Sequence, residues 1–241
     1  MNSFFTMAIA IFCIFIMAGC SLITSLLLLN KYNKHNHKFH GYNHAKKFFK
    51  RKGLYKGIVA FGSARLKPSD GDIKEIEEIS ELCAKRILKK KKKISFITGG
   101  GPGVMTAWLK PAFKLGAQTA GFCIKLPREQ KTNEYCKIHY DFTNFPSRKE
   151  TFFDYAMCYV VFKGGFGTMD ELFNLLCFIQ TKKVEKRPIF IYPASYYKNI
   201  CDFSNFINKK TINKEDAELI TYCETKEELI KNLYKVIDNY K

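Results

Sequence analysis

The chain has 241 residues and a formal net charge of +18 at pH 7. No recognised nucleic-acid motif accompanies the charge, so we expect a phosphorylated ligand and no nucleic-acid partner. The nine cysteines are odd in number and none forms a CxxC pair, which argues against a disulfide framework or a zinc site and favours a reducing compartment.

The N-terminal quarter differs in composition from the rest. Residues 4–29 are 26 in number and carry no charge, which exceeds the roughly 20 residues that span a bilayer. Residues 31–56 are rich in lysine and contain no acidic residue. We therefore expect a hydrophobic helix over 1–30 that associates with a membrane through 4–29, a basic flexible linker over 31–56, and a domain over 57–241 on the cytoplasmic side.

Other interpretations of the N-terminal quarter remain open. Residues 17–20, Met-Ala-Gly-Cys, loosely resemble a bacterial lipobox, although a small-residue cluster in a membrane helix explains them better. An apolar leader before a basic, acid-free tract is also typical of an organelle or secretory targeting segment. Four histidines lie between residues 35 and 44, and a solvated linker explains them better than a metal site.

Strand and helix patterns alternate from residue 57 onwards. The first half predicts strands over Gly57–Gly62 and Ile94–Thr98. The first strand is followed by a helix that Ser69 or Asp70 can cap. Its apolar stripe consists of Ile73, Ile76, Ile79, Cys83 and Ile87. A second helix, with Val104, Ala107 and Trp108, follows the glycine turn over 99–103.

The second half continues the alternation after a strand over Gln118–Ile124. Residues 125–145 predict a long, mostly irregular connection, and Ser147 is expected to cap the helix that follows it. The remaining elements are strands over Tyr159–Phe162, Pro188–Tyr192 and Leu219–Cys223, and helices that begin at Thr168, Ser195 and Thr225.

Such alternation predicts one α/β domain, a Rossmann-like, doubly wound parallel sheet flanked by helices. Ligands of these sheets lie beyond the carboxyl ends of the strands. Three turns lie at such ends, Gly62–Arg65, Gly99–Gly103 and Gly164–Thr168. We expect them to converge on one crevice.

The third turn admits two interpretations. Bare amides at the start of a helix, together with the positive end of its dipole, bind anions, so Gly164–Thr168 could hold a phosphate with Glu171 above it. Thr168 and Glu171 also fit a capping box, in which Glu171 only folds back onto the amide of Thr168.

Joint occurrence of several motifs identifies a family resemblance. Gly164–Glu171 resembles the GGxGTxxE motif of the LOG proteins, the cytokinin riboside 5′-monophosphate phosphoribohydrolases formerly labelled lysine decarboxylases. Phe145–Lys149 resembles the arginine-lysine element that precedes it. Residues 62–65, 98–105 and 126–130 are similar to the other signatures, and the last of these resembles the longer bacterial-type branch.

The chain departs from the family pattern at a few places. Lys163 stands where the family usually has proline, and Pro146 stands where the short branch has histidine. These two differences bear on base preference. The N-terminal quarter is not part of the family domain.

The resemblance implies a hydrolase that cleaves the N-glycosidic bond of nucleoside 5′-monophosphates, such as AMP or N6-substituted AMP, and acts as a homodimer without cofactor or metal. Arg148 and Glu171 would be catalytic. The substrate and its phosphate would be bound by Gly62, Ser63, Gly100, Gly101, Gly103, Met105, Glu129, Lys149, Gly164, Gly165, Gly167 and Thr168.

Two alternatives belong to other classes. The sequence is distantly similar to molybdenum-cofactor carriers, so a non-catalytic binding protein on the same fold is one. A membrane-recruited nucleotide sensor is the other. Lysine decarboxylation is disfavoured, because it normally uses pyridoxal phosphate on a Schiff-base lysine.

Overall fold

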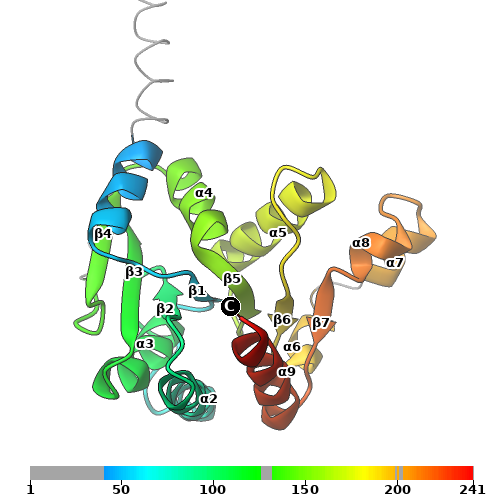
Figure 1. Ribbon diagram of the computed structural model, residues 1–241. Helices are drawn as coiled ribbons and strands as arrows, with labels where there is room; N and C mark the ends of the chain where they lie inside the picture. Colours follow the sequence, from blue (N-terminus) through cyan, green and yellow to red (C-terminus); the bar gives the residue numbers. More distant parts are fainter. Residues whose placement is uncertain (1–40, 126–131, 199, 201–202, 241) are drawn as a thin grey trace, which may run out of the picture.

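A single sheet of seven parallel strands forms the centre of the computed structural model, which describes residues 41–125, 132–198, 200 and 203–240 (Figure 1). The strand order is β4-β3-β2-β1-β5-β6-β7. The strands are β1 (Gly57–Phe61), β2 (Ser95–Thr98), β3 (Gln118–Ile124), β4 (Ile138–Phe142), β5 (Ala156–Val161), β6 (Ile189–Ile191) and β7 (Ile220–Tyr222). This confirms the predicted α/β fold.

Helices connect the strands along the chain. They are α2 (Gly71–Lys89), α3 (Val104–Lys114), α4 (Phe145–Tyr155), α5 (Phe166–Gln180), α6 (Ala194–Lys198), α7 (Phe203–Asn208), α8 (Lys214–Ala217) and α9 (Lys226–Asn239). Strands β2, β3 and β4 follow one another outward on one side of β1, and β5, β6 and β7 follow one another outward on the other side. The strand order therefore reverses between β1 and β5, where open α/β sheets bind their ligands.

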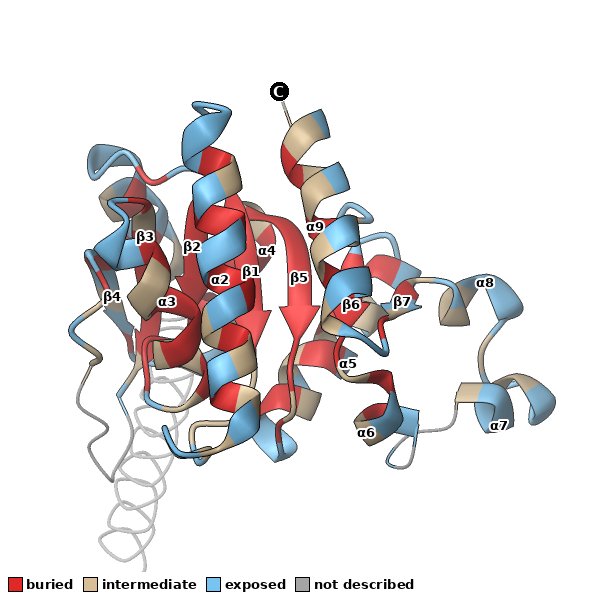
Figure 2. Ribbon diagram, turned by 90° about the horizontal axis from the view of Figure 1, so that it is seen from below, coloured by how far each residue is buried: buried red, intermediate tan, exposed pale blue. Residues whose placement is uncertain are grey.

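Two apolar layers cover the sheet. Helices α2, α3 and α9 pack on one face, while α4, α5 and α6 pack on the other (Figure 2). The predicted stripe of the first long helix is confirmed, since Ile73, Ile76, Ile79, Cys83 and Ile87 are all buried. The burial follows from side chains three and four positions apart sharing one helix face.

The prediction of a flexible linker over 31–56 is wrong for residues 41–51. Residues 41–51 are helical, and this helix lies beside α4 and β4 (Figure 1). Ala45 and Phe49 are fully buried on the same sheet face as α4 and α5. The Phe49 ring lies 4.6 Å from the Phe122 ring of β3. The basic residues of this segment hid an apolar pair spaced four residues apart, which faces the sheet.

Several element boundaries also differ from the predictions. The connection over 125–145 contains β4, which pairs in parallel with β3. Asn144, rather than Ser147, caps α4, because its side chain accepts the Ser147 amide at 2.9 Å. The single helix expected from Ser195 is divided into α6 and α7. The capping box of Thr225 and Glu228 at the start of α9 is confirmed.

The predicted apolar segment over 4–29 lies outside the described residues. Within the described part of the chain, no helix combines the length and the apolar character needed to cross a membrane.

The burial of Phe49 predicts that Phe49→Ala lowers the free energy of unfolding by about 3–5 kcal/mol, the usual loss for a large buried aromatic ring. Denaturant unfolding of the variant and the wild type would measure this. Phe113→Ala, which removes a ring that is 39% exposed, is the matched control and should cost less. Equal losses for the two variants would contradict the assignment of residues 41–51 to the core.

Candidate functional site

The three glycine turns lie together at the carboxyl ends of β1, β2 and β5. The amide of Ser63 donates to the carbonyl of Lys163 at 2.9 Å, and the amide of Val104 donates to the carbonyl of Ser63 at 3.0 Å. Gly103 has a φ of +66°, and a Cβ there would lie 2.4 Å from the Ser63 carbonyl oxygen. These contacts join the turn after β1 to both other turns, and the expected convergence is found.

Arg148 enters the site from the first turns of α4. Its side chain is 10% exposed, and its Nε donates to the carbonyl of Phe122 on β3 at 2.7 Å. The guanidinium also lies 5.2 Å from the centre of the Phe152 ring. Its Nη2 occupies the space that a side chain at Gly99 would need, because a Cβ added to Gly99 would lie 2.2 Å from this nitrogen. The guanidinium is thus held from several sides in one orientation.

Glu171 is the ion-pair partner of Arg148. Its Oε1 lies 3.1 Å from Nη1 of Arg148, and its side chain is 13% exposed. The capping-box interpretation is wrong, because α5 begins at Phe166 with Gly165 as its N-cap and has no side-chain cap. Thr168 is therefore a buried residue inside the first turn. The carboxylate of Glu171 is directed toward Arg148.

Burial controls the electrostatics of Glu171. Removal from water raises the pKa of its carboxyl above the usual 4.5, while Arg148 and, more weakly, Lys149 oppose the rise. Because the folded pKa is above the unfolded value, the stability contribution of this group is complete below about pH 4.5 and is lost as pH rises through the folded pKa. The carboxyl is therefore a stronger base than an exposed glutamate.

The predicted glycines of the first and third turns differ in what surrounds them. Gly62 packs on Val104, and a Cβ at Gly164 would lie 2.1 Å from the Thr168 hydroxyl. Gly165 and Gly167 are exposed at the start of α5, with nothing within 4 Å of an added Cβ. These two glycines leave the backbone of the third turn accessible.

The second turn is held by hydrogen bonds to a distant segment and to the helix that follows it. Gly100 has a φ of +74°, and its carbonyl accepts the Asn133 amide at 2.9 Å. The amide of Gly101 donates to the sulfur of Met105 at 3.3 Å. Gly100 and Met105 therefore shape the turn.

Lys149 and Glu129 complete the account of the predicted residues. Lys149 forms an ion pair with exposed Asp170 at 2.7 Å, and Glu129 lies outside the described residues. Among those the structure describes, no three or more His, Cys, Asp and Glu side chains gather where they could hold a metal ion.

Gly99 and the Phe122 carbonyl were not among the predicted site residues. Gly99 belongs to the glycine turn over 99–103, so its position in the sequence could have identified it as a site residue. Arg148 and Phe122 are 26 residues apart in the sequence, and no local sequence pattern predicts that they are in contact.

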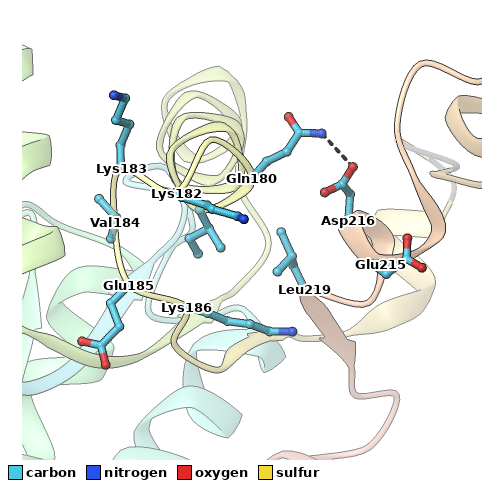
Figure 3. Close-up of a pocket in the computed structure, with 10 residues that line it drawn as sticks. Gln180, Lys182, Lys183, Val184, Glu185, Lys186, Glu215, Asp216 and Leu219 are labelled. Atoms are coloured by element: carbon cyan, nitrogen blue, oxygen red, sulfur yellow. Dashed lines mark hydrogen bonds between the residues drawn. The ribbon is translucent and has the colours of Figure 1, made fainter.

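A separate cavity lies at the other end of α5. Its volume is about 520 Å³. In Figure 3, Lys182 and Lys186 extend from the segment after α5, and Gln180 donates to Asp216 at 2.8 Å. The residues that line this cavity are Ile179, Gln180, Lys182, Lys183, Val184, Glu185, Lys186, Glu215, Asp216 and Leu219. None of the predicted site residues lines it.

The Arg148 contact predicts that Arg148→Met raises the pKa of Glu171 further, because the guanidinium favours the ionised carboxyl. Carboxyl ¹³C NMR over a pH series would measure it. Lys149→Met is the matched control and should raise the pKa less, since Lys149 is the weaker influence. A fall in the Glu171 pKa in Arg148→Met would contradict the assigned pair.

Comparisons with known proteins place the chain in a family. A family model described as "Possible lysine decarboxylase" matches residues 105–233. The molybdenum cofactor carrier protein of Chlamydomonas reinhardtii is 16% identical, with a TM-score of 0.53 over 77% of this chain and 99% of that chain. The molybdenum cofactor binding protein of Rippkaea orientalis is 18% identical, with a TM-score of 0.52 over 76% and 99%.

Sequence identities of 16% and 18% to these two structures show a shared fold alone. A search of curated proteins found no match to the chain. The family model spans more than half of the sequence, including the arginine-lysine element and the GGxGTxxE motif. The chain belongs to the LOG family, whose model carries the description "possible lysine decarboxylase".

Proposed function

We propose that this protein hydrolyses the N-glycosidic bond of nucleoside 5′-monophosphates, AMP or N6-substituted AMP, to free base and ribose 5-phosphate. The observation that carries the proposal is the Arg148–Glu171 pair. It is nearly buried, with side chains 10% and 13% exposed, and it lies one turn from the accessible start of α5. A carboxyl of raised basicity thus lies close to a backbone suited to an anion.

The start of α5 would bind the 5′-phosphate. The first amides of a helix lack partners within the helix, and the helix dipole adds positive potential there. Gly165 and Gly167 allow a ligand to approach these amides closely, because neither bears a side chain. Thr168, although buried, adds an amide in the same turn. Binding the phosphate would fix the position of the ribose, and thereby of its C1′ atom, relative to Glu171.

Glu171 and Arg148 would then act on the glycosidic bond. As the C1′–N bond breaks, its electron pair leaves with the base and positive charge develops on the ribose. Glu171 stabilises that charge and accepts a proton from the water that attacks C1′, and the proton passes to the departing base. Arg148 holds the carboxylate in place and offers its planar guanidinium to the base or nucleotide.

The family description does not change this proposal. Decarboxylation through pyridoxal phosphate requires a free lysine amine for the Schiff base. Among the described residues, Lys149 and Lys163 lie near the third turn, and they are ion-paired with Asp170 and Asp72 at 2.7 and 2.8 Å.

A carrier or binding protein is the second candidate. Its support is the fold shared with proteins named for carrying or binding molybdenum cofactor. The buried pair favours an enzyme, because burying two charges is costly and a carrier has no evident use for a basic carboxyl next to the ligand.

We expect the wild-type chain of 241 residues to release base from AMP or isopentenyl-AMP, and Glu171→Gln to reduce kcat by about 100- to 10,000-fold, as for loss of a general base. Chromatography of the released base would measure this. Glu150→Gln is the matched control, since Glu150 is a neighbour of Arg148 on α4, and should retain activity. Binding of AMP with no release by the wild type would favour the carrier.

Gly99→Ala offers a test that leaves both charged residues in place. The added methyl would lie 2.2 Å from Nη2 of Arg148, so the guanidinium must move, and we expect at least about a 10-fold loss of kcat/KM, the effect of one disturbed charge-assisted hydrogen bond. Gly71→Ala is the control, because no atom lies within 4 Å of the Cβ that the substitution adds. Full activity of Gly99→Ala would show that the observed orientation of Arg148 is not needed.

A further inference from the structure

Three successive carbonyl groups, at the end of β5 and the start of the third glycine turn, accept hydrogen bonds from other segments. The Phe162 carbonyl accepts from the Tyr197 hydroxyl at 2.6 Å, and the Gly164 carbonyl accepts from the Tyr196 hydroxyl at 3.0 Å. Between them, the Lys163 carbonyl accepts from the Ser63 amide at 2.9 Å. Two of the three donors are adjacent residues of α6.

These bonds orient the peptide planes of the turn. A peptide unit is planar, so its N–H group points away from its C=O group. Fixing the Gly164 carbonyl toward Tyr196 therefore directs the Gly165 amide away from α6. Glycine peptides otherwise rotate easily. The next carbonyl, that of Gly165, accepts the Met169 amide inside α5 at 3.0 Å, so the constraint is continuous with the helix.

Helix α6 is well placed to impose this constraint. Tyr197 is 2% exposed and belongs to the apolar layer that also contains Leu172 and Leu175 of α5. Its ring meets that of Tyr196 edge-to-face at 5.1 Å. Burial raises the pKa of the Tyr197 hydroxyl, which keeps it protonated and able to donate.

We propose that Tyr196 and Tyr197 are positioning residues that hold the third glycine turn in the form that binds the 5′-phosphate. This inference rests on the proposed function, because it assigns the phosphate to the start of α5. The sequence pattern predicted only a helix from Ser195 and assigned neither tyrosine a role. We expect these tyrosines to affect binding of the phosphate monoester group and not binding of the nucleoside part of the ligand.

The test compares ligands with and without the phosphate. Calorimetry would titrate AMP, ribose 5-phosphate and adenosine into the wild-type chain of 241 residues and into Tyr196→Phe, which removes only the hydroxyl. We expect Kd for both phosphate ligands to rise about 2- to 10-fold, the value of one hydrogen bond, and Kd for adenosine to stay unchanged. Tyr197→Phe should have the same selectivity.

Tyr159→Phe is the matched control. Tyr159 is also fully buried, and its hydroxyl has no hydrogen-bond partner among the described residues, so its loss should leave all three Kd values unchanged. Unfolding measurements on each variant would show whether the fold is retained.

Each outcome decides the inference. Unchanged phosphate binding in Tyr196→Phe, an equal loss for adenosine and AMP, or failure of the wild type to bind either phosphate ligand would overturn it. Phosphate-selective weakening would support it even if the wild type released no base. In that case the proposed reaction would fail while the positioning role would stand.

Discussion

The buried contact between Arg148 and Glu171 is the constraint on which the arrangement of the site depends. It joins α4 to α5, and through the Phe122 carbonyl it joins both to β3. Removing one partner of a buried pair leaves an uncompensated charge, which typically costs about 3–5 kcal/mol, whereas an apolar replacement of both can be neutral. The pair is therefore a weak source of stability. The proposed reaction would supply a chemical reason for placing two charges at this point.

The glycines around this contact serve two physical purposes. At Gly99 and Gly164 the missing side chain makes room for another residue, the Arg148 guanidinium in one case and the Thr168 hydroxyl in the other. Gly165 and Gly167 instead leave open space above the start of α5. A glycine-rich motif read from sequence suggests only the second purpose. The structure shows that the first is as important, because it allows charged and polar side chains to approach the turns.

The sequence was a good guide wherever one element alone determines the pattern. The β3 boundaries, the stripe of α2 and the capping box of α9 were all predicted correctly. It failed where packing decides. Only two residues of the basic helix over 41–51 are fully buried, Ala45 and Phe49, and their role becomes visible once the sheet is present. Likewise, Glu171 could be assigned to Arg148 rather than to a helix cap only after α4 and α5 were placed side by side.

The buried pair also suits the charge changes of the proposed reaction. Before the bond breaks, the Glu171 carboxylate has one positive partner, Arg148, at 3.1 Å. Cleavage would create a second positive group, the ribose, and a negative one, the departing base. A carboxylate already separated from water interacts strongly with the new cation, because little solvent must be displaced. Arg148, whose Nε donates to a backbone carbonyl and whose Nη1 contacts Glu171, would be held in place while the charges change. Both charges are held in fixed orientations by contacts within the protein, and in the proposed reaction this preorganisation would distinguish the site from a surface ion pair.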